Sequence, residues 1–463
     1  MPINSFDQYP LTWKPEKHRL KQPYYKALAA DLENKIKSGA LKPGTKLPPQ
    51  REIADYLDLN YTTITRVYEV CKKKGLIYGT TGKGTFVSPH SSEDITITTS
   101  NLDSQCIEMG AVNGFSEYSE LVERATQTVV ERGYLRDLYG YSQPAGHPHQ
   151  IAAGIRWMGQ LGVHGDHDHT AIFSGAQNAL TVALISLFSP GDRLATDRYT
   201  YSNLIELAKM LHIVLVPIEG DQEGMRADEL KKQCAASRLK GVYLMPSCAN
   251  PTTVTISERR RKELAAIIKR YDLILLEDDI SAWLTASGGE RETSLFDLLK
   301  GESIYICGMT KSLCPGLRVA YMTFGERFRR EILHGLFNAN IKTSSLDAEI
   351  ITELILSGDA YKIAMRKRGM TEKACALFSE VFPREDGEPW KVSYYQWLPI
   401  ATSKSFRQVE EDLLERGLRV YHSERFAVTE NKRQKYLRVA LCSAGSMHKL
   451  SKGLQALKDY LEE

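Results

Sequence analysis

The chain has 463 residues, of which 42% are hydrophobic and 25% are charged, the composition of a globular protein. This length exceeds one ordinary hydrophobic core and suits a small domain joined to a large one. No run approaches the roughly 18 apolar residues of a membrane helix, and the N-terminal residues form no apolar leader, so we expect a cytoplasmic protein without a membrane partner. The eight cysteines form no C-x-x-C pair, which favours reduced thiols over a disulfide framework or a zinc site and predicts no bound metal.

The charge is distributed unevenly along the chain. Residues 1–90 hold 15 Lys and Arg against 8 Asp and Glu, whereas the remaining residues hold 45 against 49. A basic small domain on a mildly acidic large one indicates a polyanionic partner for the first part alone. Residues 91–105 are polar and rich in Ser and Thr. We therefore predict a small domain over 1–90, a linker over 91–105 and a large domain over 106–463.

The first part predicts three helices followed by a hairpin. Apolar residues at helical spacing indicate helices over 24–38, 51–57 and 62–74, the third capped by Asn60 or Thr62. Short strands over 77–78 and 85–87 flank a glycine-rich turn. This is the layout of a winged helix-turn-helix that binds DNA.

The start of the third helix carries short polar groups and a cation that suit base edges in a major groove. These residues are Asn60, Tyr61, Thr62, Thr63, Thr65 and Arg66. We expect Arg51 to contact a phosphate or a guanine, and Lys83 at the wing tip to contact the DNA backbone or minor groove. A winged helix used only for protein contacts is the alternative, against which the basic balance and the polar helix argue.

Residues 41–87 resemble the GntR family of winged-helix regulators. They follow its order of a Pro-Gly turn, an L-P-x-x-R-x-x-A segment, a Thr-rich helix start and G-x-G-T-F-V. The departures are Pro49 in place of Ser and Asn60-Tyr61 in place of Ser-Arg. The loss of that arginine concerns base preference, not the ability to bind DNA.

The second part predicts an α/β fold. Short apolar strands at 170–174, 192–197, 212–218, 241–247, 273–279 and 303–308 alternate with helical stretches. That alternation indicates a mostly parallel sheet covered by helices, in which ligands bind at the carboxyl ends of the strands. The basic run over 259–262 is interpreted as a solvated helix face.

Two groups near strand ends have the chemistry of a phosphate site. Gly175, Ala176 and Gln177 open a helix, and a glycine-turned helix N-terminus attracts phosphate. Arg318 lies seven residues after Lys311 and can clamp the same phosphate with two donors.

Other residues suit a pyridine ring. Asp278 ends a buried strand, where an ionised carboxylate needs a partner such as a protonated ring nitrogen. Asn250 can hydrogen-bond a ring hydroxyl, and Tyr201 can stack on the ring or simply pack in the core. Lys311 is the candidate catalytic residue, because burial lowers the pKa of a lysine toward nucleophilic use.

These segments resemble fold-type-I aminotransferases, and with the first 90 residues the chain resembles the MocR-type subfamily of GntR regulators. The resemblance implies pyridoxal 5'-phosphate (PLP) as cofactor. It assigns Lys311 as the Schiff-base lysine, Asp278 as the pyridinium partner, Asn250 as the ring-hydroxyl ligand, Arg318 as a phosphate ligand, Tyr201 as the stacking tyrosine, Tyr141 as the tyrosine that reaches the neighbouring subunit's phosphate, and Arg438 as the arginine that binds a carboxylate. Tyr141 and Arg438 have packing or a surface ion pair as alternatives.

Two positions depart from that family. Ser281 stands where a tyrosine usually follows the aspartate, and Gly308 stands where Ser or Thr usually precedes the lysine. We expect a site that keeps PLP but transaminates weakly or not at all. The chain is interpreted as a homodimeric transcriptional regulator that binds DNA and senses a small amino compound. An active aminotransferase with a DNA-binding domain, and a cofactor-free protein whose large domain only dimerises, are the alternatives.

Overall fold

The computed structural model divides into two compact units, Met1–Thr96 and Ile97–Glu463. The described residues are 12–17, 20–37, 40–42, 44–73, 76–80, 84–88, 106–116, 118–141, 143–285, 292–384, 386–429 and 434–463. Lys83 and the linker expected over 91–105 lie outside them. None of the helices in these ranges is long and apolar enough to cross a bilayer.

The small unit contains three helices and a two-stranded hairpin. They are α1 (Tyr24–Lys37), α2 (Gln50–Leu57), α3 (Tyr61–Lys73), β1 (Ile77–Thr80) and β2 (Gly84–Val87). Each predicted helix is present within one residue of its expected ends. Leu28, Leu32 and Ile36 form the buried face of α1, as their spacing predicts, and pack with Ile53 of α2 and Val67 of α3.

A tight turn joins α2 to α3. Asp58 adopts a left-handed conformation with φ 48°, and its backbone N–H binds the carbonyl of Asp55. This turn ends α2 and reverses the chain within a few residues, so that α3 begins already packed against α2. The strands β1 and β2 are antiparallel, with Ile77 opposite Val87.

A seven-stranded sheet forms the centre of the large unit. Its order is β4 (Thr170–Phe173), β12 (Ala320–Phe324), β11 (Ile304–Gly308), β10 (Ile274–Asp278), β9 (Gly241–Leu244), β5 (Arg193–Asp197) and β6 (Val214–Ile218). All six predicted strands are present. The seventh, β12, was not predicted; it lies antiparallel between β11 and β4, while β11 through β6 are parallel.

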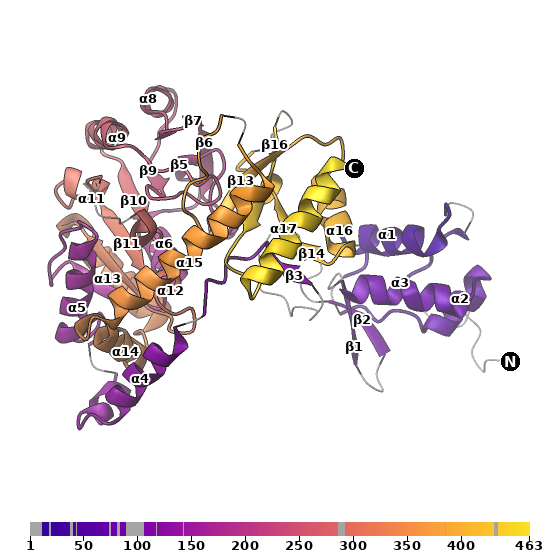
Figure 1. Cartoon of the computed structure of the whole chain (residues 1–463), viewed down its shortest axis with the longest axis horizontal. Helices are drawn as coiled ribbons and strands as arrows, with labels where there is room; N and C mark the ends of the chain where they lie inside the picture. The colour runs from indigo at the N-terminus through magenta and orange to yellow at the C-terminus, as the bar shows by residue number, and fades with distance from the viewer. Residues whose placement is uncertain are drawn as a thin grey trace. The chain divides into compact units, whose positions relative to one another are not determined.

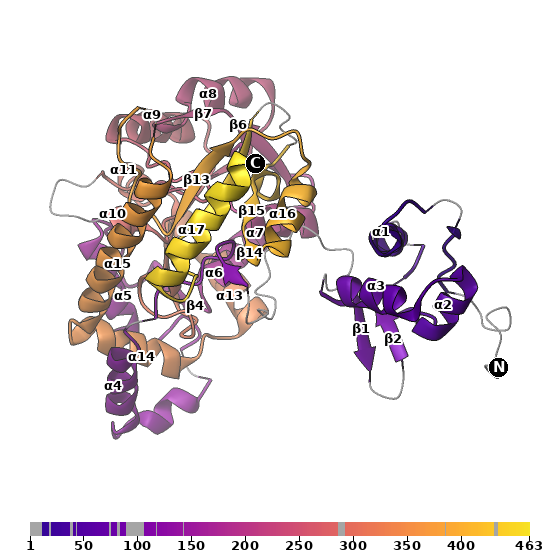
Figure 2. The same ribbon diagram turned by 45° about the vertical axis from the view of Figure 1, so that its right-hand side comes forward.

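Helices cover both faces of this sheet (Figures 1 and 2). Tyr243 and Leu276 share a core with α6 (Ala176–Leu187) and α13 (Glu326–Asn340), whereas Val242 and Leu275 share one with α8 (Ala227–Ala236) and α9 (Glu258–Arg270). Alternate residues of a strand point to opposite faces, which is why these strands read as continuous apolar runs. The remaining helices are α4 (Ser119–Val130), α5 (Pro148–Gln160), α7 (Ser202–Met210), α10 (Ala282–Thr285), α11 (Leu295–Leu298), α12 (Met309–Ser312), α14 (Ser345–Leu356), α15 (Asp359–Val381), α16 (Phe406–Glu415) and α17 (Met447–Glu462).

A second, antiparallel sheet lies beside the C-terminal helices. Its order is β13 (Tyr395–Ile400), β16 (Lys435–Ala440) and β15 (Tyr421–His422). Leu454 and Leu457 of α17 share a hydrophobic core with Leu437 and Val439 of β16, and Figure 2 shows α17 beside this sheet. Short pairs complete the unit: β3 (Ile107–Glu108) with β14 (Leu418–Arg419), and β7 (Gly220–Asp221) with β8 (Gly224–Met225).

The basic run at the start of α9 is a solvated face only in part: Arg259 and Lys262 are exposed, as we interpreted them, whereas the two arginines between them are not. Arg260 and Arg261 are buried, with 6% and 2% of their surfaces exposed. Arg260 pairs with Asp221 at 2.9 Å, and Arg261 donates to the carbonyl oxygens of Ile256 and Pro246. The prediction failed because these partners come from the β7–β8 hairpin and from the segment that follows β9, which the local charge pattern does not reveal.

Candidate functional site

The carboxyl end of β10 presents a buried carboxylate. Asp278 is 3% exposed, and its Oδ2 accepts a hydrogen bond from Tyr243 Oη at 2.7 Å. Its Oδ1 is buried without a hydrogen-bond partner among the described residues. Burial raises the pKa of Asp278 to about 7, so the ionised form requires a further cation or donor.

Lys311 lies on α12, directly after β11. Its Nζ donates to the carbonyl oxygen of Val112, and its own carbonyl accepts from Tyr394 Oη at 3.0 Å. Burial lowers the pKa of the Lys311 ammonium, and Arg438 and Arg318 lower it further. A buried lysine whose neutral form is favoured is a suitable nucleophile.

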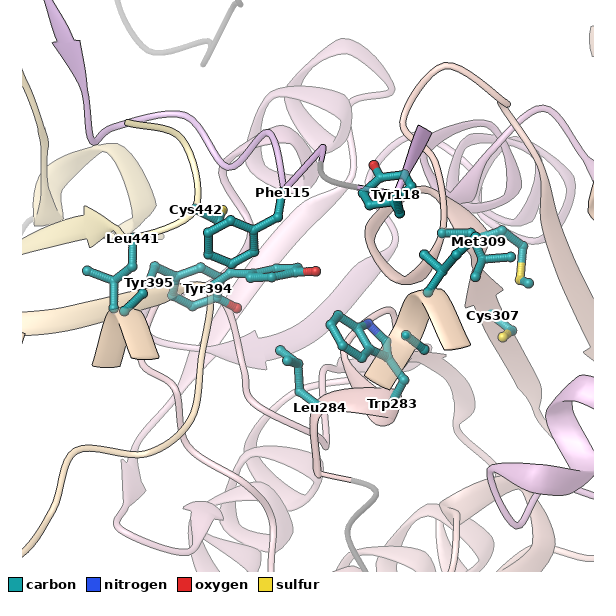
Figure 3. Close-up of a cluster of buried hydrophobic side chains, with 14 of the residues drawn as sticks. Phe115, Tyr118, Trp283, Leu284, Cys307, Met309, Tyr394, Tyr395, Leu441 and Cys442 are labelled. Atoms are coloured by element: carbon teal, nitrogen blue, oxygen red, sulfur yellow. The ribbon is translucent and has the colours of Figure 1, made fainter. Parts of the chain in front are cut away.

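An aromatic cluster supports the helix that carries this lysine. The ring of Tyr394 lies 6.0 Å from that of Phe115 and 5.4 Å from that of Trp283, and Figure 3 labels all three. Since the Tyr394 hydroxyl also binds the Lys311 carbonyl, this cluster fixes the backbone from which the lysine extends.

The residues predicted to bind a phosphate lie together in the structure. Gly175, at φ 88°, precedes α6, and no side chain caps the helix N-terminus. A Cβ atom on Gly175 would lie 2.8 Å from Nη2 of Arg318, so the guanidinium lies against this helix end and only glycine leaves it that space. The Gln177 Oε1 atom is buried here without a partner among the described residues. A helix N-terminus beside an arginine attracts a phosphate.

Asn250 and Arg438 contact each other directly. Arg438 Nη1 donates to Asn250 Oδ1 at 2.9 Å, and Nη2 donates to the Gly110 carbonyl at 2.5 Å. Arg438 is 2% exposed, and burial lowers the pKa of its guanidinium to about 10. Tyr201, just before α7, lies within electrostatic range of Asp278, Arg438 and Arg318, and burial raises its pKa to about 12. The structure thus gathers residues from six segments of the chain into one site.

The two departures from the family pattern are filled in different ways. A Cβ atom on Gly308 would lie 2.9 Å from Cγ2 of Ile280 and 3.2 Å from Cβ of Ala176, so apolar groups occupy the place of the usual hydroxyl. Ser281 is buried and hydrogen-bonds the hydroxyl of Tyr395, which donates to the Cys248 carbonyl at 3.0 Å. The phenol of Tyr395, on β13, therefore lies beside Ser281, the position where the family usually has a tyrosine.

These residues fit PLP. The unpartnered Oδ1 of Asp278 suits a protonated pyridine nitrogen, the Gly175–Arg318 cradle suits the phosphate, and Lys311 suits the carbonyl carbon. Tyr141 is not part of this cluster: 82% of its surface is exposed.

The predicted DNA-binding residues lie around the start of α3 and divide into two groups. Three are held by their own unit: Asn60 Oδ1 caps α3 by accepting from Thr62 N at 3.0 Å, Thr65 Oγ1 donates to Gln50 at 3.0 Å, and the Arg66 guanidinium lies 3.9 Å from the ring centre of Tyr25. The other four are Arg51, Tyr61, Thr62 and Thr63. Exposure does not separate the two groups, because Asn60 and Arg66 are exposed like Arg51, Tyr61 and Thr62, whereas Thr63 and Thr65 are half-buried. Arg51 lies over the ring of Tyr61 at 5.9 Å.

The sequence reasoning missed four residues of these two sites. These residues are Tyr243, which contacts Asp278, Tyr394, which contacts Lys311, Tyr395, which contacts Ser281, and Gln50, which orients Thr65. The feature that could have identified Tyr243 is its position in a parallel strand next to β10, where it lies opposite Leu276. Tyr394 and Tyr395 carry no local signal, because they are brought in by the second sheet.

Two families match the chain. Residues 24–87 match the bacterial regulatory proteins of the gntR family, and residues 110–457 match aminotransferase class I and II. The uncharacterised HTH-type transcriptional regulator YdeF of Bacillus subtilis (strain 168) is 34% identical over 464 residues, which cover 100% of both chains. The uncharacterised HTH-type transcriptional regulator YjiR of Escherichia coli (strain K12) is 24% identical and covers 78% of this chain and 82% of its own.

Solved aminotransferases share the fold of the large unit. The kynurenine aminotransferase of Pyrococcus horikoshii has a TM-score of 0.70 at 20% identity and covers 78% of this chain and 91% of its own. The alpha-aminoadipate aminotransferase of Thermus thermophilus has a TM-score of 0.70 at 20% identity, with 78% and 92% covered. The chain therefore belongs to the PLP-dependent aminotransferase class I and II family and, with its GntR winged helix, has the architecture of the MocR-type transcriptional regulators.

Proposed function

We propose that this chain regulates transcription in the cytoplasm by binding DNA through its small unit and sensing a small amino compound at a PLP site in its large unit. One observation carries the proposal. The DNA-binding unit is joined to a site in which a buried carboxylate oxygen of Asp278 lacks a partner among the described residues and a buried lysine has a lowered pKa. Bound PLP supplies a carbonyl that condenses with amines and a ring that accepts electron density.

In this proposal each residue of the site contacts a different part of PLP. Asp278, oriented by Tyr243, holds a proton on the ring nitrogen; Arg318 and the backbone N–H groups of residues 175–177 hold the phosphate. Asn250 binds the ring hydroxyl and Tyr201 covers the ring face. Lys311 would bond the carbonyl carbon, the same atom for which an amine of the ligand would compete.

Arg438 sets the preference for an acidic ligand. Two of its nitrogens are used on Asn250 and Gly110, whereas its Nε is buried without a partner among the described residues. A carboxylate on the amino compound would satisfy this donor and the buried charge. The Lys311 amine freed by that ligand, and the ligand's contact to Arg438 on β16, would change how the second sheet packs on the first.

We also propose a homodimer. The exposed Tyr141 suits a role at the neighbouring subunit's phosphate, and a two-fold symmetric reader suits a repeated DNA half-site. Light scattering of the PLP-loaded protein should give twice the chain mass of 52.2 kDa. A monomer mass would contradict the proposal.

Borohydride reduction tests the cofactor assignment. The wild-type chain should retain PLP covalently after reduction, and Lys311→Ala should not. Lys449→Ala, which removes an exposed lysine of α17, is the matched control and should trap PLP as the wild type does. Trapping on a different lysine in Lys311→Ala would refute the role of Lys311.

Gel-shift titration at several salt concentrations tests the DNA surface. Arg51→Ala should lower the salt slope by about one if Arg51 contacts a phosphate, and Thr63→Ala should relax base preference by roughly 1–3 kcal/mol. Lys449→Ala should match the wild type. Wild-type affinity in both variants would show that this surface does not bind DNA.

An active aminotransferase is the second candidate, and one observation favours it. The Tyr395 hydroxyl beside Ser281 places a phenol near the position from which the family's tyrosine acts. The two candidates differ in the fate of an amino acid added to the loaded protein. Persistence of the bound amino acid supports the sensor, and release of a keto acid with conversion of the cofactor to its amine form supports the enzyme.

A further inference from the structure

A cavity of about 950 Å³ opens beyond the carboxyl ends of β9, β5 and β6, on the part of the sheet farthest from β4 and β12. Neither Asp278, Lys311 nor Arg318 lines it. Its size lies within the range of about 300–1,000 Å³ that is usual for small-molecule sites. The cavity is therefore a second space at the same edge of the sheet, distinct from the site described above.

One wall of the cavity is aromatic. The rings of Trp397 and Tyr436 stack at 4.9 Å, and the ring of Tyr199 stands edge-on to both, at 5.2 Å and 5.9 Å. These side chains come from β13, β16 and the segment after β5. Ring faces carry partial negative charge, so an aromatic wall attracts a cation as well as apolar surface.

The charged residues of the cavity leave one carboxylate unbalanced. Arg198 pairs with Glu219, with Nε at 2.8 Å from Oε1, and Asp221 pairs with the buried Arg260. No cation or hydrogen-bond donor among the described residues contacts the side chain of Asp197, which ends β5. Burial raises the pKa of that carboxyl to about 7, and an ammonium ion would supply the missing partner.

We propose that this cavity binds an organic ammonium ion, with its charged nitrogen at Asp197 and its hydrocarbon part along the wall formed by Tyr199, Trp397 and Tyr436. An anion is disfavoured because the two arginines nearby are already neutralised. The apolar floor, made by Met245, Val254 and Ile256, suits a hydrocarbon group. The site requires no cofactor and differs in this respect from the amine site proposed above.

Four segments serve both sites, which indicates that they are coupled. In each segment one residue lines the cavity and a neighbouring residue belongs to the PLP site. The residues that line the cavity are Tyr199, Ala249, Trp397 and Tyr436, and their neighbours in the PLP site are, in the same order, Tyr201, Asn250, Tyr395 and Arg438. A ligand that orders the cavity therefore orders the backbone on which the PLP site is built. We expect the ammonium ion to shift the absorption of bound PLP without reacting with it.

Benzyltrimethylammonium tests the proposal, because a quaternary nitrogen cannot condense with PLP. Calorimetric titration of the full chain should show saturable binding with one site per chain, unchanged in Lys311→Ala. Asp197→Asn and Trp397→Leu should each weaken binding about tenfold or more, and Lys449→Ala should leave it unchanged. Benzyl alcohol, which lacks the charge, should not bind measurably.

Several results would overturn the proposal. They are absence of saturable binding to the wild type, equal binding by Asp197→Asn, or loss of binding in Lys311→Ala, which would move the probe to the PLP site. Tyr436→Leu gives a second test of the aromatic wall in case Trp397→Leu does not fold, which far-ultraviolet circular dichroism would show.

Discussion

The buried carboxylate of Asp278 should make the cofactor-free protein less stable than a variant that lacks the charge. Raising the pKa of Asp278 from 3.8 to about 7 corresponds to about 4 kcal/mol, and its 3% exposure leaves little solvent to screen this cost. Asp278→Asn preserves the size of the side chain and can still accept the hydrogen bond from Tyr243. In the absence of PLP we therefore expect Asp278→Asn to be more stable than the wild type at pH 8, by up to about 4 kcal/mol.

The direction of the pH dependence follows from proton binding. At pH values well below 3.8 the carboxyl is protonated in both the folded and the unfolded chain, so its ionisation contributes no difference in stability between the two proteins. Between pH 4 and 7 the unfolded chain releases the proton that the folded chain keeps, and the free energy of unfolding of the wild type falls as the pH rises. Above pH 7 the difference should be constant. Saturating PLP should reverse the order, because its ring nitrogen pairs with the ionised carboxylate only in the wild type.

Urea unfolding followed by tryptophan fluorescence measures this difference, since four of the five tryptophans lie in the large unit. Asp272→Asn is the matched control, because the Asp272 side chain is 84% exposed and its removal should change stability little. Equal stability of Asp278→Asn and the wild type at pH 8 would refute the reasoning. So would an identical gain from PLP in both proteins.

Three further outcomes follow from contacts in the PLP site. Tyr243→Phe removes the donor at 2.7 Å from Asp278 and should weaken PLP binding roughly tenfold, which titration of the visible absorption measures; unchanged affinity would contradict the contact. Gly308→Ser should also weaken PLP binding, because the serine side chain would clash with Ile280 and Ala176. Combining Gly308→Ser with Ile280→Ala should restore at least the wild-type affinity. Additive effects of the two substitutions in this double-mutant cycle would refute the steric explanation. Tyr395→Phe should shift the absorption of bound PLP and its pH dependence if the phenol acts on the ring, and an unchanged spectrum would show that Tyr395 only packs.

The sequence predicted the parts of the large unit that depend on local pattern. The six strands found by their apolar runs are present, and Asp278 and Lys311 follow from strand ends and the family resemblance. The strand β12 was not predicted because Ala320–Phe324 pairs antiparallel between β11 and β4, two strands that are distant from each other in the chain. A single short apolar run carries no information on which neighbours it will pair with.

Residues that act through long-range contacts could not be predicted in the same way. Arg260 and Arg261 read as a charged surface, but partners in other segments make them buried supports. In the small unit, the choice between Asn60 and Thr62 as the cap of α3 was open in the sequence, and the hydrogen bond from Thr62 N to Asn60 decides it. That bond engages the Oδ1 atom of Asn60, whose side chain is nevertheless exposed.

The two departures from the family pattern have opposite physical consequences. At Gly308 the apolar groups of Ile280 and Ala176 lie close to where a Cβ atom would be. Under the proposed function, the phosphate therefore loses a donor and depends more on Arg318 and the start of α6. At Ser281 the nearby phenol belongs to Tyr395, on the strand β13 that pairs with the Arg438 strand β16. Under the proposed function, we expect a displacement of Arg438 by a ligand's acid group to reach Tyr395 through this strand pair. In the family pattern the tyrosine follows the aspartate by three residues, next to the first sheet. Here the phenol lies on the same sheet as Arg438. Under the proposed function, this arrangement would couple ligand binding to the environment of the cofactor more directly than it would serve repeated turnover.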